Sequence, residues 1–292
     1  MLNTSTAADA ATPVPGLCRE SIPERLSCRA DGSRHNSILA ALPEEDYHRL
    51  ASLLQPVTVE AEQMLSEAAT PANSVYFPVS AVLSLRFVLE DGLSSEIATI
   101  GHEGIYGASL LADDAIASCI AVVQSAGRAY RGPAAGVARE FQRGGAFQRL
   151  VLRHLQTLFM QVAQTSSCNG SHTVEQRTCR WLLGILERGN GNELNVTHEQ
   201  LACILAVRRE SVTATAGRLQ DEGAIRYKRG RLIVLARREL ERRACACHSV
   251  LRNLYARTLN HGPAMVRDIY AAGGRTSFAG AMGVAGAFGS RY

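Results

Sequence analysis

The stretch "THEQLACILAVRRESVTATAGRLQDEGAIRYKRGRLIVL", residues 197–235, decides the fold of the C-terminal half. Thr197, followed three residues later by Gln200, is a capping box, which marks the start of a helix. A second helix is expected at 208–222, because Gly223 is the type of residue that commonly follows a helix. Two short strands then surround a tight turn at 228–230. Helix, helix, strand and strand in this order predict a winged helix-turn-helix.

The second of these helices divides into an inward and an outward face. On a wheel of about 100° per residue, Val212, Ala216 and Leu219 cluster on the side that faces the domain core. An arginine can donate two hydrogen bonds to guanine, and a carboxylate can accept one from cytosine. A carboxylate that faced a phosphate would be repelled instead. The residues predicted to read DNA bases from the outward side are Arg209, Glu210, Thr213 and Ala214.

The basic charge of the chain is concentrated in this region. The 292 residues carry a formal charge of +4, while eleven basic and six acidic residues between 197 and 243 give that segment +5. Cations grouped on one domain indicate a polyanion-binding face, and their phosphate contacts set affinity but not sequence preference. The alternative is a structural helix with a solvated charged surface. The predicted phosphate contacts include Thr197, Arg218, Lys228, Arg229 and Arg231.

The N-terminal half has a different pattern. Residues 1–35 lack periodicity and are expected to be a mobile arm, whereas residues 37–54 have helical spacing. From Pro56 to about Gly132, short runs of Val, Leu, Phe and Ile alternate with turn residues, and Asp91-Gly92 is a strong hairpin signal. Many short antiparallel strands predict a β-roll or barrel.

A long helix is predicted between the two halves, at residues 137–165, with one flaw at Gly144-Gly145. Five apolar residues recur on it at gaps of 4, 4, 3 and 4, which is close to the seam of a coiled coil. We expect this stripe to pair with the same helix of a second chain in a homodimer. The alternative is that it packs on its own β-domain. The stripe consists of Phe147, Val151, Leu155, Leu158 and Val162.

These motifs resemble those of the Crp/Fnr family of bacterial transcription regulators. The R-E-[ST]-V signature of its DNA-binding domain stands here as Arg209-Glu210-Ser211-Val212, and "CNGSHTVEQRTCRWLL" (168–183) is similar to the start of that domain in one branch. The resemblance covers about residues 38–243. It implies an α+β fold with an N-terminal cyclic-nucleotide-binding-like β-roll, a long dimerisation helix and a C-terminal winged helix-turn-helix.

The resemblance also implies partners and roles. The family forms homodimers that read a near-palindromic site on double-stranded DNA, and an activator would also contact RNA polymerase. By the same resemblance Arg209 and Glu210 read bases, and Ser211 contacts the DNA backbone. The expected parts are an arm at 1–35, a β-roll at 36–136, the dimerisation helix at 137–165, the winged helix-turn-helix at 166–243 and a partly disordered extension at 244–292.

The sequence argues against the best-known ligands of such a β-roll. Relatives that bind a cyclic nucleotide hold its phosphate with a Gly-Glu pair and a later Arg, because a buried phosphate needs a cationic partner. Residues 101–127 contain no Arg or Lys, and Ala108 rather than Glu follows Gly107. An iron–sulfur cluster is not expected either, since Cys18, Cys28 and Cys119 are one ligand short. We predict no cofactor.

The cysteines and the absence of export signals indicate the compartment. No apolar run approaches the 18 residues of a membrane span, and the start "MLNTSTAADAATPVPG" lacks the features of a signal peptide. We expect a cytoplasmic protein with no membrane partner, whose eight cysteines are thiols. The segment "CACH" (245–248), together with Cys168 or His172, has ligands that suit zinc or a redox centre. Because Cys-x-Cys is unusual ligand spacing, ordinary thiols are the preferred interpretation and no metal is predicted.

Two other classes of function stay open as alternatives. One is a cupin-like β-roll metal enzyme, for which His102-Glu103 alone does not supply enough ligands. The other is an adaptor that binds a protein partner through the helix stripe, which would not require Arg209, Glu210 or the cations of the hairpin. We therefore expect a DNA-binding protein rather than an enzyme.

Overall fold

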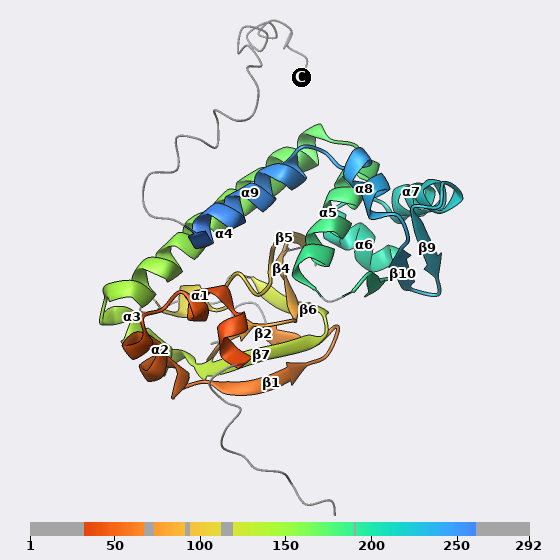
Figure 1. The fold of residues 1–292 in the computed structure, drawn as a ribbon. Coiled ribbons are helices and arrows are strands. Elements are labelled where there is room, and N and C mark those ends of the chain that lie inside the picture. The colour runs from red at the N-terminus through yellow and green to blue at the C-terminus, as the bar shows by residue number, and fades with distance from the viewer. Residues whose placement is uncertain (1–31, 67–72, 91–93, 112–118, 190, 261–292) are drawn as a thin grey trace, which may run out of the picture.

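The fold combines a β-domain, a long helix and a C-terminal helical domain with a small sheet. The computed structural model describes residues 32–66, 73–90, 94–111, 119–189 and 191–260 (Figure 1). This is the predicted α+β architecture. Of the expected arm, the four residues of a short 3-10 helix, η1 (Gly32–His35), are described and the rest lies outside the described residues.

The β-domain contains two antiparallel sheets within the described residues. Their strand orders are β1-β7-β3 and β2-β6-β4-β5. The strands are β1 (Gln55–Val59), β2 (Met64–Ser66), β3 (Ser74–Pro78), β4 (Val82–Val88), β5 (Ser94–Ile100), β6 (Ile120–Ser125) and β7 (Gly127–Pro133). β4 and β5 form the predicted hairpin, with Val88 opposite Ser94, although the Asp91-Gly92 turn lies outside the described residues. Leu83, Ile100 and Val123 lie in the buried core of this domain.

In the described part of the chain, four short helices pack with the β-domain; two precede its strands in the chain, one lies between β5 and β6, and one follows β7. They are α1 (Ser37–Ala40), α2 (Glu44–Ala51), the 3-10 helix η2 (Ala108–Leu111) and α3 (Ala134–Gln142). The expected helical lead-in at 37–54 is confirmed as α1 and α2. Asn36 caps α1 by accepting hydrogen bonds from the amides of Ile38 and Leu39, and its own amide group donates to Pro78 O and Gly104 O. This side chain therefore ties the lead-in helices to the β-domain.

The predicted long helix is divided at its two glycines. α3 ends before them, and α4 (Gly145–Ser171) continues for 27 residues. Gly144 and Gly145 have φ of 80° and 83°, a region that favours glycine because it lacks a Cβ atom. The main helix thus begins at 145 rather than 137 and ends at 171 rather than 165.

The apolar stripe of α4 packs on its own chain. Phe147 and Val151 are buried in a cluster with residues of α1, α2 and β3, and Leu155 packs against that cluster. Leu158 and Val162 pack against the core of the β-domain. Phe147 and Val151 therefore have no surface left for a second chain, whereas Leu155, Leu158 and Val162 are half-buried, and the dimer seam itself stays a prediction. The spacing identified a buried stripe, but spacing does not say which surface buries it.

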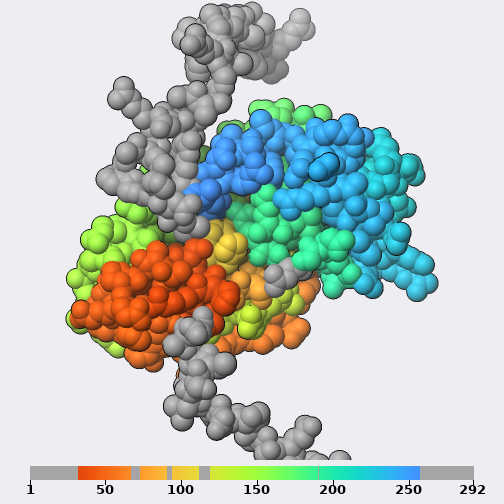
Figure 2. Space-filling view, in the orientation of Figure 1, coloured from red at the N-terminus to blue at the C-terminus, as the bar shows by residue number. Residues whose placement is uncertain are grey.

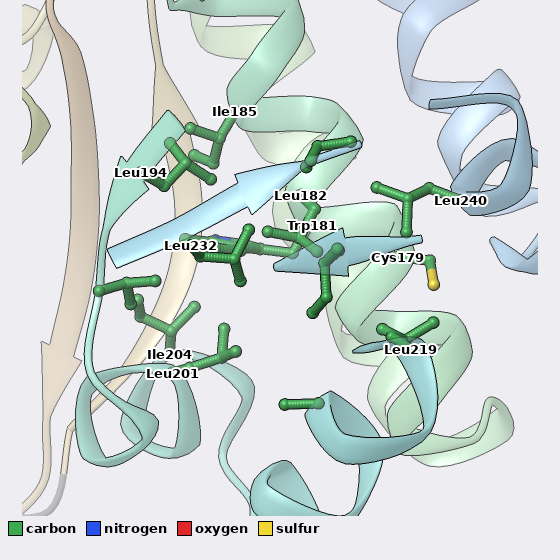
Figure 3. Close-up of a cluster of buried hydrophobic side chains, with 14 of the residues drawn as sticks. Cys179, Trp181, Leu182, Ile185, Leu194, Leu201, Ile204, Leu219, Leu232 and Leu240 are labelled. Atoms are coloured by element: carbon green, nitrogen blue, oxygen red, sulfur yellow. The ribbon is translucent and has the colours of Figure 1, made fainter. Parts of the chain in front are cut away.

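The C-terminal domain has the predicted order of elements. They are α5 (Val174–Arg188), β8 (Glu193–Asn195), α6 (His198–Leu205), α7 (Arg209–Asp221), β9 (Ile225–Lys228), β10 (Arg231–Val234) and α8 (Arg237–Arg243). The three strands form a sheet of order β8-β10-β9. Apolar side chains from every layer meet in one cluster, including Leu182 of α5, Leu201 of α6 and Leu232 of β10 (Figure 3). This core holds α6 and α7 in fixed positions.

A helix that the sequence analysis did not anticipate follows this domain. α9 (Cys247–Asn260) lies beside α4 and also contacts α5 (Figure 1). Its residues Leu251, Leu254 and Tyr255 are buried, so the first part of the extension, which was expected to be partly disordered, is an ordered helix. In the space-filling view, α9 lies between the two domains, in blue (Figure 2). No described helix is both long and apolar enough to cross a membrane.

Candidate nucleic-acid interface

The turn between α6 and α7 has the features that the sequence predicted. Thr197 accepts a hydrogen bond from the Gln200 amide at 3.1 Å, and the Thr197 amide donates to Gln200 Oε1 at 2.7 Å, which completes the capping box. Ala206 ends α6 in the left-handed conformation, with φ of 50°. Arg208 is then the N-cap of α7. Thr197 thus has a structural role at the start of α6.

The faces of α7 are arranged as the helical wheel predicts. Val212, Ala216 and Leu219 are buried in the domain core, and Thr215 is buried beside them. The exposed residues are Arg209, Glu210, Thr213, Ala214, Gly217, Arg218, Gln220 and Asp221, whereas Ser211 is half-buried. The outward side of the first two turns therefore offers one cation, one carboxylate and small side chains to a partner.

The charges at the start of α7 are held only loosely. Arg209 Nε lies 3.8 Å from Glu199 Oε2, and both side chains are largely exposed, at 65% and 76%. Ion pairs this exposed contribute about 0–1 kcal/mol, so Arg209 can exchange Glu199 for another acceptor at little cost. Glu210 has no ion pair with any residue that the structure describes. These two side chains are free to contact a ligand.

His198 fixes the angle between α6, α7 and the β9–β10 hairpin. Its Nδ1 lies 3.0 Å from the hydroxyl of Thr213, and its ring packs on Tyr227 with a centroid distance of 4.5 Å. Burial, together with the charge of Arg209, lowers the pKa of His198, which favours the neutral ring. The Thr213 hydroxyl also donates to Arg209 O at 3.1 Å. Thr213 is thus held by its own domain, a constraint that the sequence did not reveal.

A cluster of arginines and carboxylates supports α7 from behind. Arg218 Nε lies 3.2 Å from Glu175 Oε2 on α5, and the same carboxylate binds Arg243 Nη1 of α8 at 2.9 Å. Arg243 also pairs with Glu222, just after α7. Arg218, predicted as a phosphate contact, is therefore partly neutralised by Glu175. Sequence spacing could not have identified this pair, since the two residues are 43 positions apart.

The hairpin cations lie on a tight two-residue turn. Lys228 is opposite Arg231, and the turn residues Arg229 and Gly230 have φ of 52° and 78°, as a type I′ turn requires. Arg231 forms an ion pair with Glu193 on β8. Lys228 and Arg229 are exposed and have no ion pair with the described residues. They lie at the tip of the hairpin, and Arg226 on β9 is likewise exposed and without an ion pair to the described residues.

A cavity of about 350 Å³ lies between the two domains, lined by β5, α4, α5 and α9. Three arginines line it, Arg180, Arg188 and Arg252. Arg188 is largely buried and already paired, with Nε 2.6 Å from Glu103 Oε1 and its guanidinium over the ring of Tyr255. Glu96 accepts hydrogen bonds from Trp181 Nε1 at 2.9 Å and from Ser84 Oγ at 2.6 Å. These groups join the domains to each other, and Arg188 is not available to a phosphate.

The geometry agrees with comparisons to known proteins. Residues 176–243 match the family model of the Crp-like helix-turn-helix domain. No curated protein sequence matches the chain significantly. A protein from Eubacterium rectale assigned to the Crp/Fnr transcriptional regulators has a similar structure, with 16% identity and a TM-score of 0.58, over 72% of this chain and 98% of its own.

Two further structures share the fold. FixK2 from Bradyrhizobium japonicum has 14% identity and a TM-score of 0.55, over 66% of this chain and 98% of its own. The c-di-GMP-responsive regulator CLP from Xanthomonas campestris has 15% identity and a TM-score of 0.52, over 66% and 99%. At these identities the likeness shows the fold alone. The chain thus contains a Crp-like helix-turn-helix domain, a DNA-binding module, within the fold of Crp/Fnr regulators.

Proposed function

We propose that this chain is a transcription regulator that reads a specific DNA sequence by placing α7 in the major groove. The observation that carries the proposal is the division of α7: Val212, Ala216 and Leu219 are buried, while Arg209 and Glu210 are exposed at its first turn. A guanidinium and a carboxylate side by side can bind guanine and cytosine edges, respectively. Ala214, exposed one turn on, can meet a thymine methyl group, and Thr213 lies beside it.

The remaining polar residues would position the domain on the DNA backbone. Lys228 and Arg229 extend from the tip of the β9–β10 hairpin without competing carboxylates among the described residues, which suits contacts to phosphate. Arg231 and Arg218 would contribute after releasing Glu193 and Glu175. Ser211 and Thr197, at the starts of α7 and α6, complete the proposed set of phosphate contacts.

We also propose that the active form is a homodimer, paired through a different face of α4 from the one predicted. Leu152 and Phe159 are 52% and 70% exposed, which is unusual for large apolar side chains. With exposed Gln156 and Ala163 they recur at gaps of 4, 3 and 4, the spacing of a coiled-coil seam. A second copy with the same face would cover both side chains. Two α7 helices would then reach the two halves of a near-palindromic site.

The dimer face is tested by placing a charge on the proposed seam and, as a control, on an exposed residue elsewhere. Phe159→Glu should give monomers in sedimentation experiments at concentrations where the unchanged chain is a dimer. Phe87→Glu makes the same substitution at an exposed phenylalanine of β4, away from the proposed seam, and should remain dimeric. If the unchanged chain sediments as a monomer, or Phe159→Glu as a dimer, this face is not the seam.

The DNA proposal is tested by selecting bound duplexes from a random-sequence pool with the full chain and then titrating variants against the selected site. Arg209→Ala should cost about 1–3 kcal/mol of specific binding, the worth of a bidentate base contact, and should relax the preference at one base pair in each half-site. Binding to unrelated DNA should change little. A chain that binds every duplex equally, or an Arg209→Ala variant with an unchanged sequence profile, would contradict the proposal.

The effector proposal is that no cyclic nucleotide controls this chain, because residues 101–127 supply no cation for its phosphate. If the chain activates transcription, we propose that it also contacts RNA polymerase. The cupin-like enzyme accounts only for the β-domain and gives no role to the exposed first turn of α7. The adaptor likewise leaves the Crp-like domain and the unpaired hairpin cations without a purpose.

A further inference from the structure

Three sulfur atoms and one ring nitrogen meet where the two domains join. Cys168 lies in the last turn of α4 and His172 is the C-cap of that helix. Cys245 lies between α8 and α9, and Cys247 is the first residue of α9. One ligand atom from each of these four residues lies within 4.8 Å of the others. His248, which the sequence analysis grouped with the two later cysteines, faces Glu187 instead, with Nε2 3.1 Å from Oε1.

The distances in this cluster fit a tetrahedral metal site. Cys168 Sγ lies 3.5 Å from Cys245 Sγ, and Cys247 Sγ lies 3.6 Å from His172 Nδ1. With Zn–S bonds of about 2.3 Å and Zn–N bonds of about 2.0 Å, tetrahedral geometry spaces neighbouring ligand atoms by about 3.5–3.8 Å. A disulfide would require about 2.05 Å between the two sulfur atoms. The cluster is therefore spaced for a shared ion rather than for a bond between two thiols.

We infer that Cys168, His172, Cys245 and Cys247 bind one zinc ion. Three cysteines and one histidine are a common set of ligands for structural zinc, and four protein ligands leave no position open for a substrate. The three cysteines are buried, at 0%, 5% and 4% exposed, so the ion would be shielded from water. Soft thiolate ligands in tetrahedral array select zinc over magnesium or calcium. This inference concerns the stability of the junction and does not depend on the DNA proposal.

The residues around the cluster have the properties of a metal site's surroundings. Gln164 Nε2 donates a hydrogen bond to Cys247 Sγ at 3.0 Å, which would orient a thiolate ligand. Arg177 is 5% exposed and lies near Cys168 and Cys245; its Nη2 donates a hydrogen bond to Leu205 O, while its Nε has no hydrogen-bond partner among the described residues. Zinc with three thiolates has a net charge of −1. A buried guanidinium would be costly beside neutral thiols but is compensated beside this anion.

The position of the cluster indicates what the ion would do. Cys168 and His172 precede α5, whereas Cys245 and Cys247 follow α8, so the four ligands enclose the whole winged helix-turn-helix. One ion would fasten both ends of that domain, and the start of α9, to the end of α4. A bound ion would close a loop of about 70 residues between His172 and Cys245. The free energy of metal binding would then stabilise the folded domain.

Metal content and cobalt spectroscopy test the inference on the full chain. Purified under reducing conditions and passed through a desalting column, the chain should retain one zinc per chain. After removal of zinc with a chelator, one equivalent of Co²⁺ should produce the intense visible bands of a tetrahedral site and a sulfur-to-cobalt absorption, and zinc should abolish both. A chain that binds neither metal, or that shows a Cys168–Cys245 disulfide and no metal in mass spectrometry, would overturn the inference.

Variants identify the ligands. Cys245→Ser and the half-buried His172→Ala should lose the stoichiometric metal, while Gln164→Leu should bind it about 10–100-fold more weakly, as expected for a hydrogen bond to a ligand. Cys203→Ser, which changes a half-buried thiol on α6, and the double variant Cys18→Ser/Cys28→Ser should keep one equivalent. Equal losses in Cys203→Ser and Cys245→Ser would refute the assignment. Should Cys245→Ser fail to fold, His172→Ala and the cobalt spectrum of the unchanged chain still decide.

Discussion

Helices α7 and α4 each have one face inside the molecule and one outside, but they distribute their apolar residues differently. α7 buries Val212, Ala216 and Leu219 and exposes charged and small side chains. α4 buries Phe147 and Val151 and yet leaves Leu152 and Phe159 exposed. An outer face without large apolar groups suits a charged, hydrated partner such as DNA. An outer face that holds a leucine and a phenylalanine suits another protein surface.

The largest expected effect tests the two faces of α4 against each other. Phe147→Ala should lower the free energy of unfolding by about 3–5 kcal/mol, because Phe147 is 3% exposed and its removal leaves a cavity. Phe159 lies on the outer face and its side chain is 70% exposed. Phe159→Ala should therefore lower the free energy of unfolding of the monomer by less than about 1 kcal/mol. Urea denaturation monitored by circular dichroism measures both. Similar losses for the two variants would show that the faces are not distinct.

The second-largest expected effect concerns a buried carboxyl group, that of Glu96. Glu96 is buried where β5 meets α5, and burial raises its pKa to about 7, although hydrogen bonds from Ser84 and Trp181 and the charges of Arg86 and Arg180 oppose the rise. The folded state therefore holds this proton more tightly than the unfolded chain. The resulting stabilisation is fully present below the unfolded pKa of 4.5 and is lost as pH rises through 7.

Glu96→Gln should remove this dependence on pH, because the amide can accept from Trp181 and donate to Ser84 without carrying a charge. Relative to the unchanged chain, the free energy of unfolding of the variant should rise by about 3 kcal/mol in total between pH 4 and pH 8. Glu210→Gln, on the exposed face of α7, is the matched control and should follow the unchanged chain at every pH. Chemical denaturation at four or five pH values measures the difference, and parallel curves for all three proteins would sink the prediction.

The smallest expected effect compares two cations of the β9–β10 hairpin. Lys228→Ala should weaken binding to all DNA sequences similarly and reduce the slope of log affinity against log salt by about 1. Arg231→Ala should change the slope less, because Arg231 is already paired with Glu193 and neutralises less phosphate charge. Arg139→Ala, on α3 of the β-domain, should leave the slope unchanged. Binding titrations at several salt concentrations distinguish these outcomes, and equal slopes for Lys228→Ala and the unchanged chain would remove Lys228 from the interface.

Much of the C-terminal domain could be predicted from the sequence because its signals are local. A capping box at Thr197, a glycine after α7 and a two-residue turn at Arg229-Gly230 each act within a few residues. The faces of α7 were equally predictable, since charged and apolar residues separate cleanly on it. The placement of bases and phosphates against these residues stays a prediction.

The contacts that join the two domains, and those in the cysteine cluster, could not be predicted in the same way because they link residues far apart in the chain. Cys168 meets Cys245 across 77 positions, and Arg188 meets Glu103 across 85. On α4, apolar residues occur on two faces, and periodicity alone did not show which of them meets the β-domain. The helix α9 was missed because its few apolar residues become significant only once α4 and α5 supply a surface to pack on.

The two glycines where α4 begins, Gly144 and Gly145, have a mechanical consequence. A helix of 27 residues is a lever arm about 40 Å long. Contacts with β5 and α9 hold its direction, and the helix starts at Gly144 and Gly145, where any side chain would be strained by the positive φ. A swing of about 10° there carries the far end of α4 through about 7 Å, roughly two base-pair steps of DNA. In the proposed homodimer, the direction of α4 would therefore help to set the distance between the two α7 helices.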